Sequence, residues 1–272
     1  MGNGVTVMSM VFLSSALISL AENERVELLG LKPSSLITAI GTVSGILSAI
    51  MLPFMGALVD CTPHRKRVGI IFTAIMISIQ IIQIGITQMN WKYMVFLQAI
   101  NGFIFQVTTL AAYSYLPEIA RDIGEKRMTK YSSKFFMMMF ALESIYLIIV
   151  IGISIYYGMD DVVTGRMALA INVVMAGSCY YYGWDFLTHK KGSCDLTGKS
   201  LCKSGFSQVF CTASGIWKHY AKSLGWYLFA VMFAEAGKNS FDEIRYEIYL
   251  SKYLITHNHP CLRNVQGLVL LH

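Results

Sequence analysis

Seven apolar stretches follow one another between Gly4 and Ala236, and none of the chain's 22 Lys and Arg residues lies inside them. They cover residues 4–20, 34–59, 68–89, 93–116, 135–158, 167–187 and 224–236. Those between 34 and 187 are each about as long as a helix needs to cross roughly 30 Å of hydrocarbon. Because lipid offers the backbone no hydrogen-bond partner and the stretches lack the alternation of barrel strands, they predict helices. The expected fold class is therefore an all-α membrane protein.

The Lys and Arg residues between the stretches alternate in number from one connecting loop to the next. Loops 60–67, 117–134 and 188–223 hold fourteen of them, whereas loops 21–33, 90–92 and 159–166 hold four. Basic residues stay on the cytoplasmic side when a membrane protein is inserted. We therefore expect a multi-pass protein whose N-terminus and three richer loops face the cytosol.

Composition argues against several other classes of protein. Hydrophobic residues make up 55% and charged residues 14% of the chain, whereas about a quarter of the residues are charged in a typical soluble domain. The net charge of +6 comes from loops beside lipid headgroups, so we expect the bilayer and no nucleic acid as a partner. The six cysteines show no zinc-ligand spacing, and the helices carry no catalytic arrangement of acids, histidines or nucleophiles. We therefore expect no metal, no cofactor and no enzymatic activity.

The most specific local motif is the short loop between the second and third stretches. Gly56 and Asp60 come at the end of the second helix, and Arg65, Lys66 and Arg67 form a basic cluster before the third. The glycine allows two helices to approach closely, the acid can pair with nearby bases, and the cluster anchors the loop at the membrane interface. This loop resembles the signature loop of the major facilitator superfamily. The resemblance implies that these residues latch one conformation of a transporter through ion pairs that break when the helices rock.

A second motif makes the resemblance narrower. Residues 112–120 end the fourth helix and contain Leu116, Pro117 and Glu118, and the preceding loop has the pattern Asp-x-Thr-Pro-x-Arg. Both resemble the autophagy-related protein 22-like family of vacuolar effluxers. Residues 221–240 are similar to the start of that family's seventh helix. The resemblance implies a twelve-helix transporter, built from two six-helix halves, that moves amino acids out of the vacuole.

Polar side chains within the apolar stretches predict either a pathway or contacts that hold the helices together. Gln80 and Gln83 share one face of the third helix, and Gln98 and Asn101 share one face of the fourth. Two stripes on consecutive helices suit a central cavity, and they also suit hydrogen bonds between helices. Both interpretations stay open at this point.

Glu143 is a charged residue inside the stretch 135–158. A charge at the centre of a spanning helix costs about 2.5–3.5 kcal/mol on insertion scales, so this carboxyl should face the interior of the bundle. It is our candidate for proton coupling, with contact to the loop network at the cytosolic end as the alternative. Tyr146 lies three residues later on the same face. With the four amides, these two residues form the candidate substrate or proton pathway.

The stretches divide the chain into four parts. Residues 1–187 are expected to form an N-terminal six-helix transmembrane bundle, 188–223 a basic cytosolic linker, 224–240 a partial seventh helix, and 241–272 a polar tail outside the family fold. A twelve-helix transporter would need further spans. The sequence therefore suggests a truncated product or a half-transporter that dimerises.

The function expected from these features is secondary active transport of small solutes by alternating access, with protons as a possible coupling ion. By resemblance, the solutes are amino acids that leave a vacuole, in a process linked to autophagy. One alternative is a seven-helix receptor, which the segment count permits, but it would place the N-terminus outside against the charge asymmetry. Another alternative is a transporter fragment without function.

Overall fold

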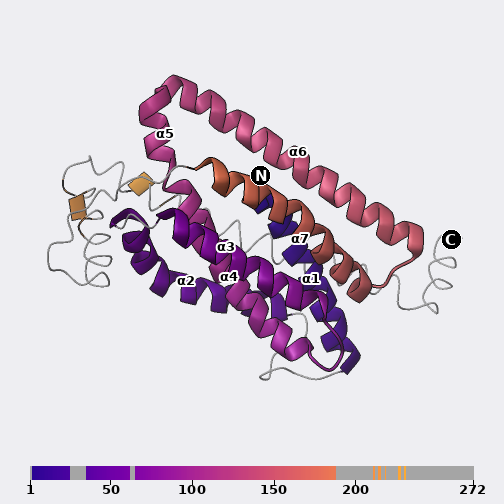
Figure 1. Ribbon diagram of the computed structural model, residues 1–272. Helices are drawn as coiled ribbons and strands as arrows, with labels where there is room; N and C mark the ends of the chain where they lie inside the picture. Colours follow the sequence, from indigo (N-terminus) through magenta and orange to yellow (C-terminus); the bar gives the residue numbers. More distant parts are fainter. Residues whose placement is uncertain are drawn as a thin grey trace, which may run out of the picture.

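A computed structural model describes residues 2–24, 35–61 and 65–187, and single positions at 211, 214, 215, 218, 226, 227 and 230. The described ranges contain helices and no strand (Figure 1). The helices are α1 (Gly2–Glu24), α2 (Leu36–Cys61), α3 (Arg65–Ile84), α4 (Trp91–Tyr113), α5 (Leu116–Ile123), α6 (Glu125–Tyr157) and α7 (Asp161–Phe186). Six of these, all except α5, contain a span long and apolar enough to cross a membrane. The all-α membrane fold is thereby confirmed.

The segment expected as the loop 117–134 is helical instead. The chain forms α5 and then begins α6 at Glu125, well before the apolar stretch that starts at 135. Pro117 lies in the first turn of α5, where a missing backbone N–H leaves no hydrogen bond unmade. Gly124 separates α5 from α6 with a φ of +79°, a conformation that glycine adopts without steric cost. The apolar stretch thus marked only part of α6, and the candidate span in this helix runs from Arg127 to Tyr157.

The connection between α6 and α7 is also shorter than expected. Gly158 ends α6 with a φ of +60°. The side chain of Asp160 then accepts a hydrogen bond from the backbone N–H of Val163 at 3.3 Å and caps the start of α7. Three predicted parts lie almost entirely outside the described residues. They are the linker 188–223, the seventh helix at 224–240 and the tail 241–272.

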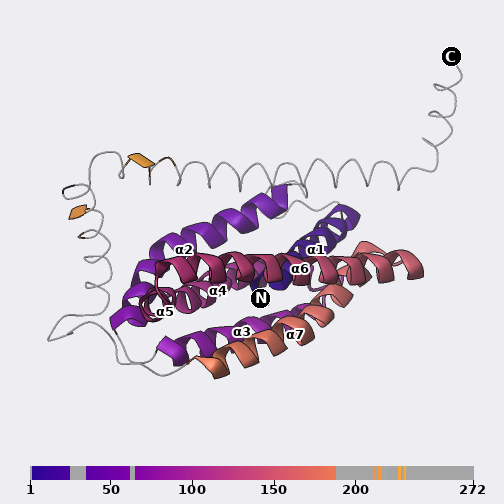
Figure 2. The same cartoon turned by 90° about the horizontal axis from the view of Figure 1, so that it is seen from above.

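The six long helices pack in a pattern that repeats within the bundle. α1 packs along α7 and α3 along α4, while α2 packs on α4, α6 on α1, and α3 on α7. The contacts repeat when α1 is exchanged with α4, α2 with α6, and α3 with α7. The α1–α7 contact then becomes the α4–α3 contact, the α2–α4 contact becomes the α6–α1 contact, and the α3–α7 contact stays the same. Since each half has three spanning helices, the two halves have opposite orientations in the membrane. Figure 2 shows α3 and α7 along one flank of the bundle and α2 along the other.

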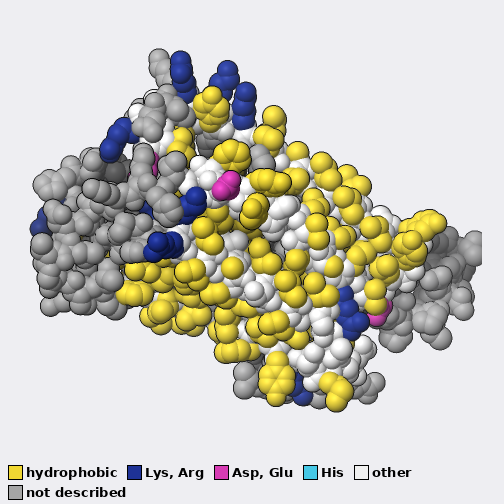
Figure 3. All heavy atoms as spheres, in the orientation of Figure 1, with side chains coloured by type: hydrophobic (Ala, Val, Ile, Leu, Met, Phe, Trp, Pro, Cys, Tyr) yellow, Lys and Arg dark blue, Asp and Glu magenta, His cyan; other side chains and the backbone are white. Residues whose placement is uncertain are grey.

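Burial shows which helices form the centre of this bundle. In α1 and α4, 56% of the most apolar window is buried, compared with 22% in α2 and 11% in α6. Exposed apolar side chains on α2 and α6 include Val43, Ile46, Ile145 and Ile148. Figure 3 shows apolar side chains over much of the visible face, with most of the visible Lys and Arg side chains around α5 and the start of α6. This distribution is typical of a membrane-embedded bundle with a basic end.

Close helix approaches occur at glycines other than the one we expected. A Cβ atom on Gly69 of α3 would lie 2.1 Å from a ring carbon of Trp184 on α7, and one on Gly165 of α7 would lie 2.9 Å from the Cβ of Ala16 on α1. At Gly56, a Cβ would meet no described atom within 4 Å. A close approach at Gly56 therefore stays a prediction, since none occurs among the described residues.

Candidate functional site

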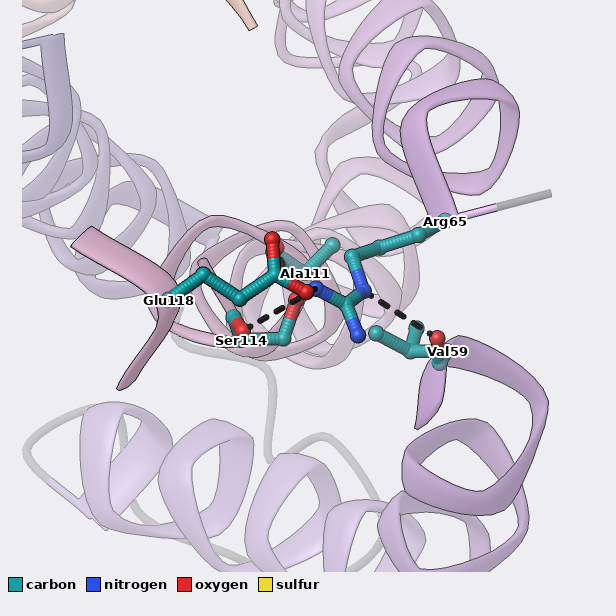
Figure 4. A network of polar contacts seen from close by, with 5 residues as sticks. All are labelled: Val59, Arg65, Ala111, Ser114 and Glu118. Carbon is teal, nitrogen blue, oxygen red and sulfur yellow. Dashed lines mark hydrogen bonds and ion pairs between the residues drawn. The ribbon is translucent and has the colours of Figure 1, made fainter. Parts of the chain in front are cut away.

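Arg65 joins the ends of several helices at the basic end of the bundle. Its Nη1 donates to Oε1 of Glu118 at 3.0 Å and to the backbone carbonyl of Ser114 at 3.2 Å, and its Nε donates to the carbonyl of Val59 at 3.3 Å. The guanidinium also lies 5.1 Å from the ring centroid of Tyr115, within range of a cation–π interaction. Figure 4 shows Arg65 between Val59 on one side and Ser114 and Glu118 on the other. One side chain thus connects α3 with the ends of α2 and α4 and with α5.

The local structure explains why an arginine suits this position. Val59 and Ser114 lie at the C-terminal ends of α2 and α4, where backbone carbonyls lack partners within the helix and the helix dipole favours a cation. Glu118 lies in the first turn of α5, where the dipole favours an acid. The planar fork of an arginine can reach acceptors in several directions at once. The Arg65 side chain is 11% exposed and that of Glu118 25%, so water screens the ion pair only in part.

The other residues of the predicted latch loop lie around this centre. Lys66 donates from Nζ to the backbone carbonyl of Asp185, at the end of α7, at 3.4 Å. Arg67 is exposed. At Asp60 the structure describes the helical backbone of α2, and the side chain lies outside what it describes. The ion pair in the described structure therefore joins the basic cluster to Glu118 of the second motif, although sequence reasoning treated the two motifs separately.

The contact of Lys66 has a counterpart at the opposite end of the bundle. Nε and Nη2 of Arg166, near the start of α7, both donate to the carbonyl of Ile86, just beyond the end of α3, the first at 2.9 Å. Because α3 and α7 run antiparallel, each helix has a basic residue near its start that binds a carbonyl at the end of the other. The two contacts hold α3 and α7 in register.

The four amides of the predicted pathway are all buried between helices of this one bundle. Gln80, Gln83, Gln98 and Asn101 are each at most 4% exposed. Nε2 of Gln83 donates to Oε1 of Gln98 at 3.1 Å, which joins α3 to α4. Asn172 of α7 donates to Oε1 of Gln80 at 2.8 Å. These bonds hold helices together, and a solute pathway along the same residues stays a prediction.

Several residues of this polar network were missed from the sequence. Asn172, fully buried on α7, also faces the hydroxyl of Thr6 on α1 at 3.5 Å. Asn3 accepts a hydrogen bond from the hydroxyl of Tyr180 at 2.8 Å and donates to Thr109 at 3.2 Å. The available signal for Asn172 was an amide side chain within an apolar stretch, which we applied to the third and fourth stretches and not to the sixth, whereas Asn3 lies before the first stretch and gave no such signal.

Glu143 and Tyr146 of α6 face α1 and α7. A Cβ on Gly4 of α1 would lie 2.9 Å from Oε2 of Glu143, so this glycine leaves the space that the carboxyl occupies. The hydroxyl of Tyr146 donates to the carbonyl of Ala168 on α7 at 2.9 Å, and its ring packs edge-on against Phe12 of α1. Tyr146 is fully buried and attaches α6 to the bundle. Glu143 is partly exposed, so it is the more accessible of the two.

An inverted repeat of three spanning helices is the arrangement found within each half of major-facilitator transporters and in several other transporter folds. The family model described as vacuole effluxer Atg22 like matches residues 19–244. Since the match covers most of the chain and includes Arg65 and Glu118, the protein belongs to this family of transporters. No curated protein and no solved structure gives a significant match.

Proposed function

We propose that this protein exports small solutes, amino acids in particular, from a vacuole by secondary active transport with alternating access. Membership of the vacuolar effluxer family supports the direction and the compartment. The observation that carries the mechanism is the set of contacts around Arg65, which connects helix ends at one side of the membrane. Contacts of this kind stabilise one conformation, and they separate in another if α5 moves relative to α3 during the transport cycle.

The strength of the Arg65–Glu118 pair suits such a switch. A fully exposed ion pair contributes about 0–1 kcal/mol, whereas removing one partner of a fully buried pair costs about 3–5 kcal/mol. With exposed side-chain fractions of 11% and 25%, the pair lies between these limits. Glu118 can therefore return to water without a large penalty when α5 moves away from α3. The pair biases a conformational equilibrium and does not lock it.

The proposal is tested by reconstituting the full chain into liposomes loaded with labelled amino acids. Alternating access requires two bundles around one site, so efflux by this chain requires two copies that pair as a half-transporter dimer. In that case we expect saturable efflux that is accelerated by the same amino acid on the outer side. Empty liposomes and liposomes with heat-denatured protein are the controls. Linear leakage equal to that of the controls would contradict the proposal and favour a fragment without function.

Glu143 is our candidate for proton coupling in this cycle. It lies on a membrane-spanning helix beside Gly4 of α1, in a place where an ionisable group needs a functional or structural reason. Glu143→Gln keeps the shape of the side chain and removes its ionisation, so the transport rate should depend less on pH. Glu22→Gln, at an exposed position near the end of α1, is the matched control and should leave the pH profile unchanged. A profile that survives Glu143→Gln intact would make Glu143 a structural residue.

The orientation in the membrane is a separate prediction. On a background without cysteines, a cysteine introduced at position 125 should react with an impermeant maleimide from the cytosolic side, because the richer basic loops are expected there. A cysteine at Met89, which is 95% exposed in the link between α3 and α4, should react from the opposite side. Labelling with the two sides reversed would show that the topology is wrong.

A further inference from the structure

Asn101 has no hydrogen-bond partner among the described residues although it is completely buried. Both polar atoms of its side chain, Nδ2 and Oδ1, are unpaired. Two more unpaired atoms belong to neighbouring amides on α3, namely Nε2 of Gln80 and Oε1 of Gln83. These three side chains are at most 1% exposed, so bulk solvent does not reach them.

The three residues that carry these atoms are neighbours along the contact between α3 and α4. The two helices are antiparallel neighbours joined by the short link 85–90, and Gln83 binds Gln98 directly. One turn from this bond, three residues back along α3 and three residues forward along α4, lie Gln80 and Asn101. Side chains three apart on a helix lie on the same face. Gln80 and Asn101 therefore form the next pair across the α3–α4 contact.

The side chain of Gln80 is also fixed in place from the other side. Its Oε1 accepts the 2.8 Å hydrogen bond from Asn172 of α7, so rotation of the amide towards another partner would break that bond. A buried amide group without a hydrogen bond costs about 1–3 kcal/mol, and bulk water does not reach these side chains to reduce this cost. Four such atoms, on three side chains within one turn of one another along the α3–α4 contact, call for a ligand.

The unpaired atoms identify what that ligand is. Two are donors, Nε2 of Gln80 and Nδ2 of Asn101, and two are acceptors, Oε1 of Gln83 and Oδ1 of Asn101. An anion would satisfy only the donors and a metal cation only the acceptors, whereas a water molecule accepts two hydrogen bonds and donates two. Buried water typically makes about three hydrogen bonds to such groups. We propose that water binds between α3 and α4 at Gln80, Gln83 and Asn101.

This hydration site gives the amide pair a role that does not depend on transport. The direct bond between Gln83 and Gln98 and the water-mediated contact one turn away together hold α3 against α4.

The direction in which one substitution changes the melting temperature tests the proposal. Asn101→Leu removes an amide of similar size. If water binds there, the variant loses the hydrogen bonds to water and leaves Gln80 unpaired, so the melting temperature of the purified chain in detergent micelles should fall. If the site is dry, the same variant removes two unpaired buried groups, so the melting temperature should stay the same or rise. Either of these last results would overturn the proposal.

Coupling between the two helices provides a second measurement. In a double-mutant cycle with Gln80→Met and Asn101→Leu, water that bridges both side chains makes the effects non-additive. We expect the double variant to change the unfolding equilibrium constant several-fold less than the product of the single effects. The hydrogen bond to Asn172 is lost both in the Gln80→Met variant and in the double variant, so its contribution cancels when the coupling between the two substitutions is calculated. Purely additive effects would contradict a shared water.

Radiolytic labelling of the unmodified chain avoids any question of misfolded variants. Bound water yields hydroxyl radicals that oxidise adjacent side chains even when bulk solvent cannot reach them. Met76, fully buried one turn before Gln80, should therefore be oxidised more than Met55 of α2, which is also buried. Equal oxidation of Met76 and Met55 would count against bound water at this site.

Discussion

Replacing Arg65 with glutamine is expected to lower the free energy of unfolding by about 1.5–3 kcal/mol, the range for hydrogen bonds that involve a charged group. One guanidinium donates to Glu118, Ser114 and Val59 at 3.0–3.3 Å, and glutamine can neither reach all three acceptors nor carry the charge. The same variant should slow amino-acid exchange, because the conformation that these contacts stabilise becomes less populated. Thermal unfolding in detergent micelles and the initial rate of exchange in liposomes measure the two effects.

Arg67→Gln is the matched control for this experiment. Arg67 lies two residues further along the same helix and is exposed, so its substitution should change stability by no more than about 0.5 kcal/mol. Arg65→Lys separates charge from geometry, since lysine keeps the charge and lacks the planar fork. We expect lysine to restore only part of the loss. Equal effects of Arg65→Gln and Arg67→Gln on stability and transport would contradict the role assigned to Arg65.

Replacing Gly69 with alanine is expected to destabilise the bundle by about 1–3 kcal/mol, the range for overpacking a close contact. The new Cβ would lie 2.1, 2.5 and 2.6 Å from three ring carbons of Trp184, which is buried and cannot simply turn away. Its indole N–H also donates to the hydroxyl of Thr73 at 2.9 Å, and moving the ring would break this bond. The contact between α3 and α7 should therefore loosen, with a lower melting temperature as the readout.

Gly45→Ala is the same chemical change, but we do not expect it to destabilise the bundle. No described atom lies within 4 Å of a Cβ at Gly45 of α2. Alanine in a helix is favoured over glycine by about 0.5–1 kcal/mol, so this variant should be as stable as the original protein or more so. Trp184→Phe should rescue part of the loss in Gly69→Ala by making room. If Gly69→Ala and Gly45→Ala change the melting temperature equally, Gly69 does not pack closely against Trp184.

The spanning part of the fold could be predicted because its physical requirement is simple. A helix that crosses lipid must be apolar over about 20 residues, and this requirement leaves a direct trace in the sequence. α5 and the first turns of α6 left no such trace. They are polar, and their boundaries depend on Gly124 and on Pro117 in a first turn.

The candidate site could be predicted only as two separate parts. The basic cluster and the Leu-Pro-Glu motif each stood out, but Arg65 and Glu118 are 53 residues apart and meet because α2, α3 and α4 pack together. The polar stripes on α3 and α4 were likewise predicted to lie on helix faces. Which helices they would face depended on tertiary packing, and so the bond between Asn172 and Gln80, 92 residues apart, was missed.

The central claim is that Arg65 and Glu118 act as one unit in the transport cycle. Exchange rates of Arg65→Gln, Glu118→Gln and the double variant, measured in liposomes with equal amounts of protein, test it most directly. If the two residues act through their 3.0 Å ion pair, the double variant should be no slower than the slower single variant. If the two single effects multiply in the double variant, the residues act independently, and the pair is not the switch that links these helix ends to transport.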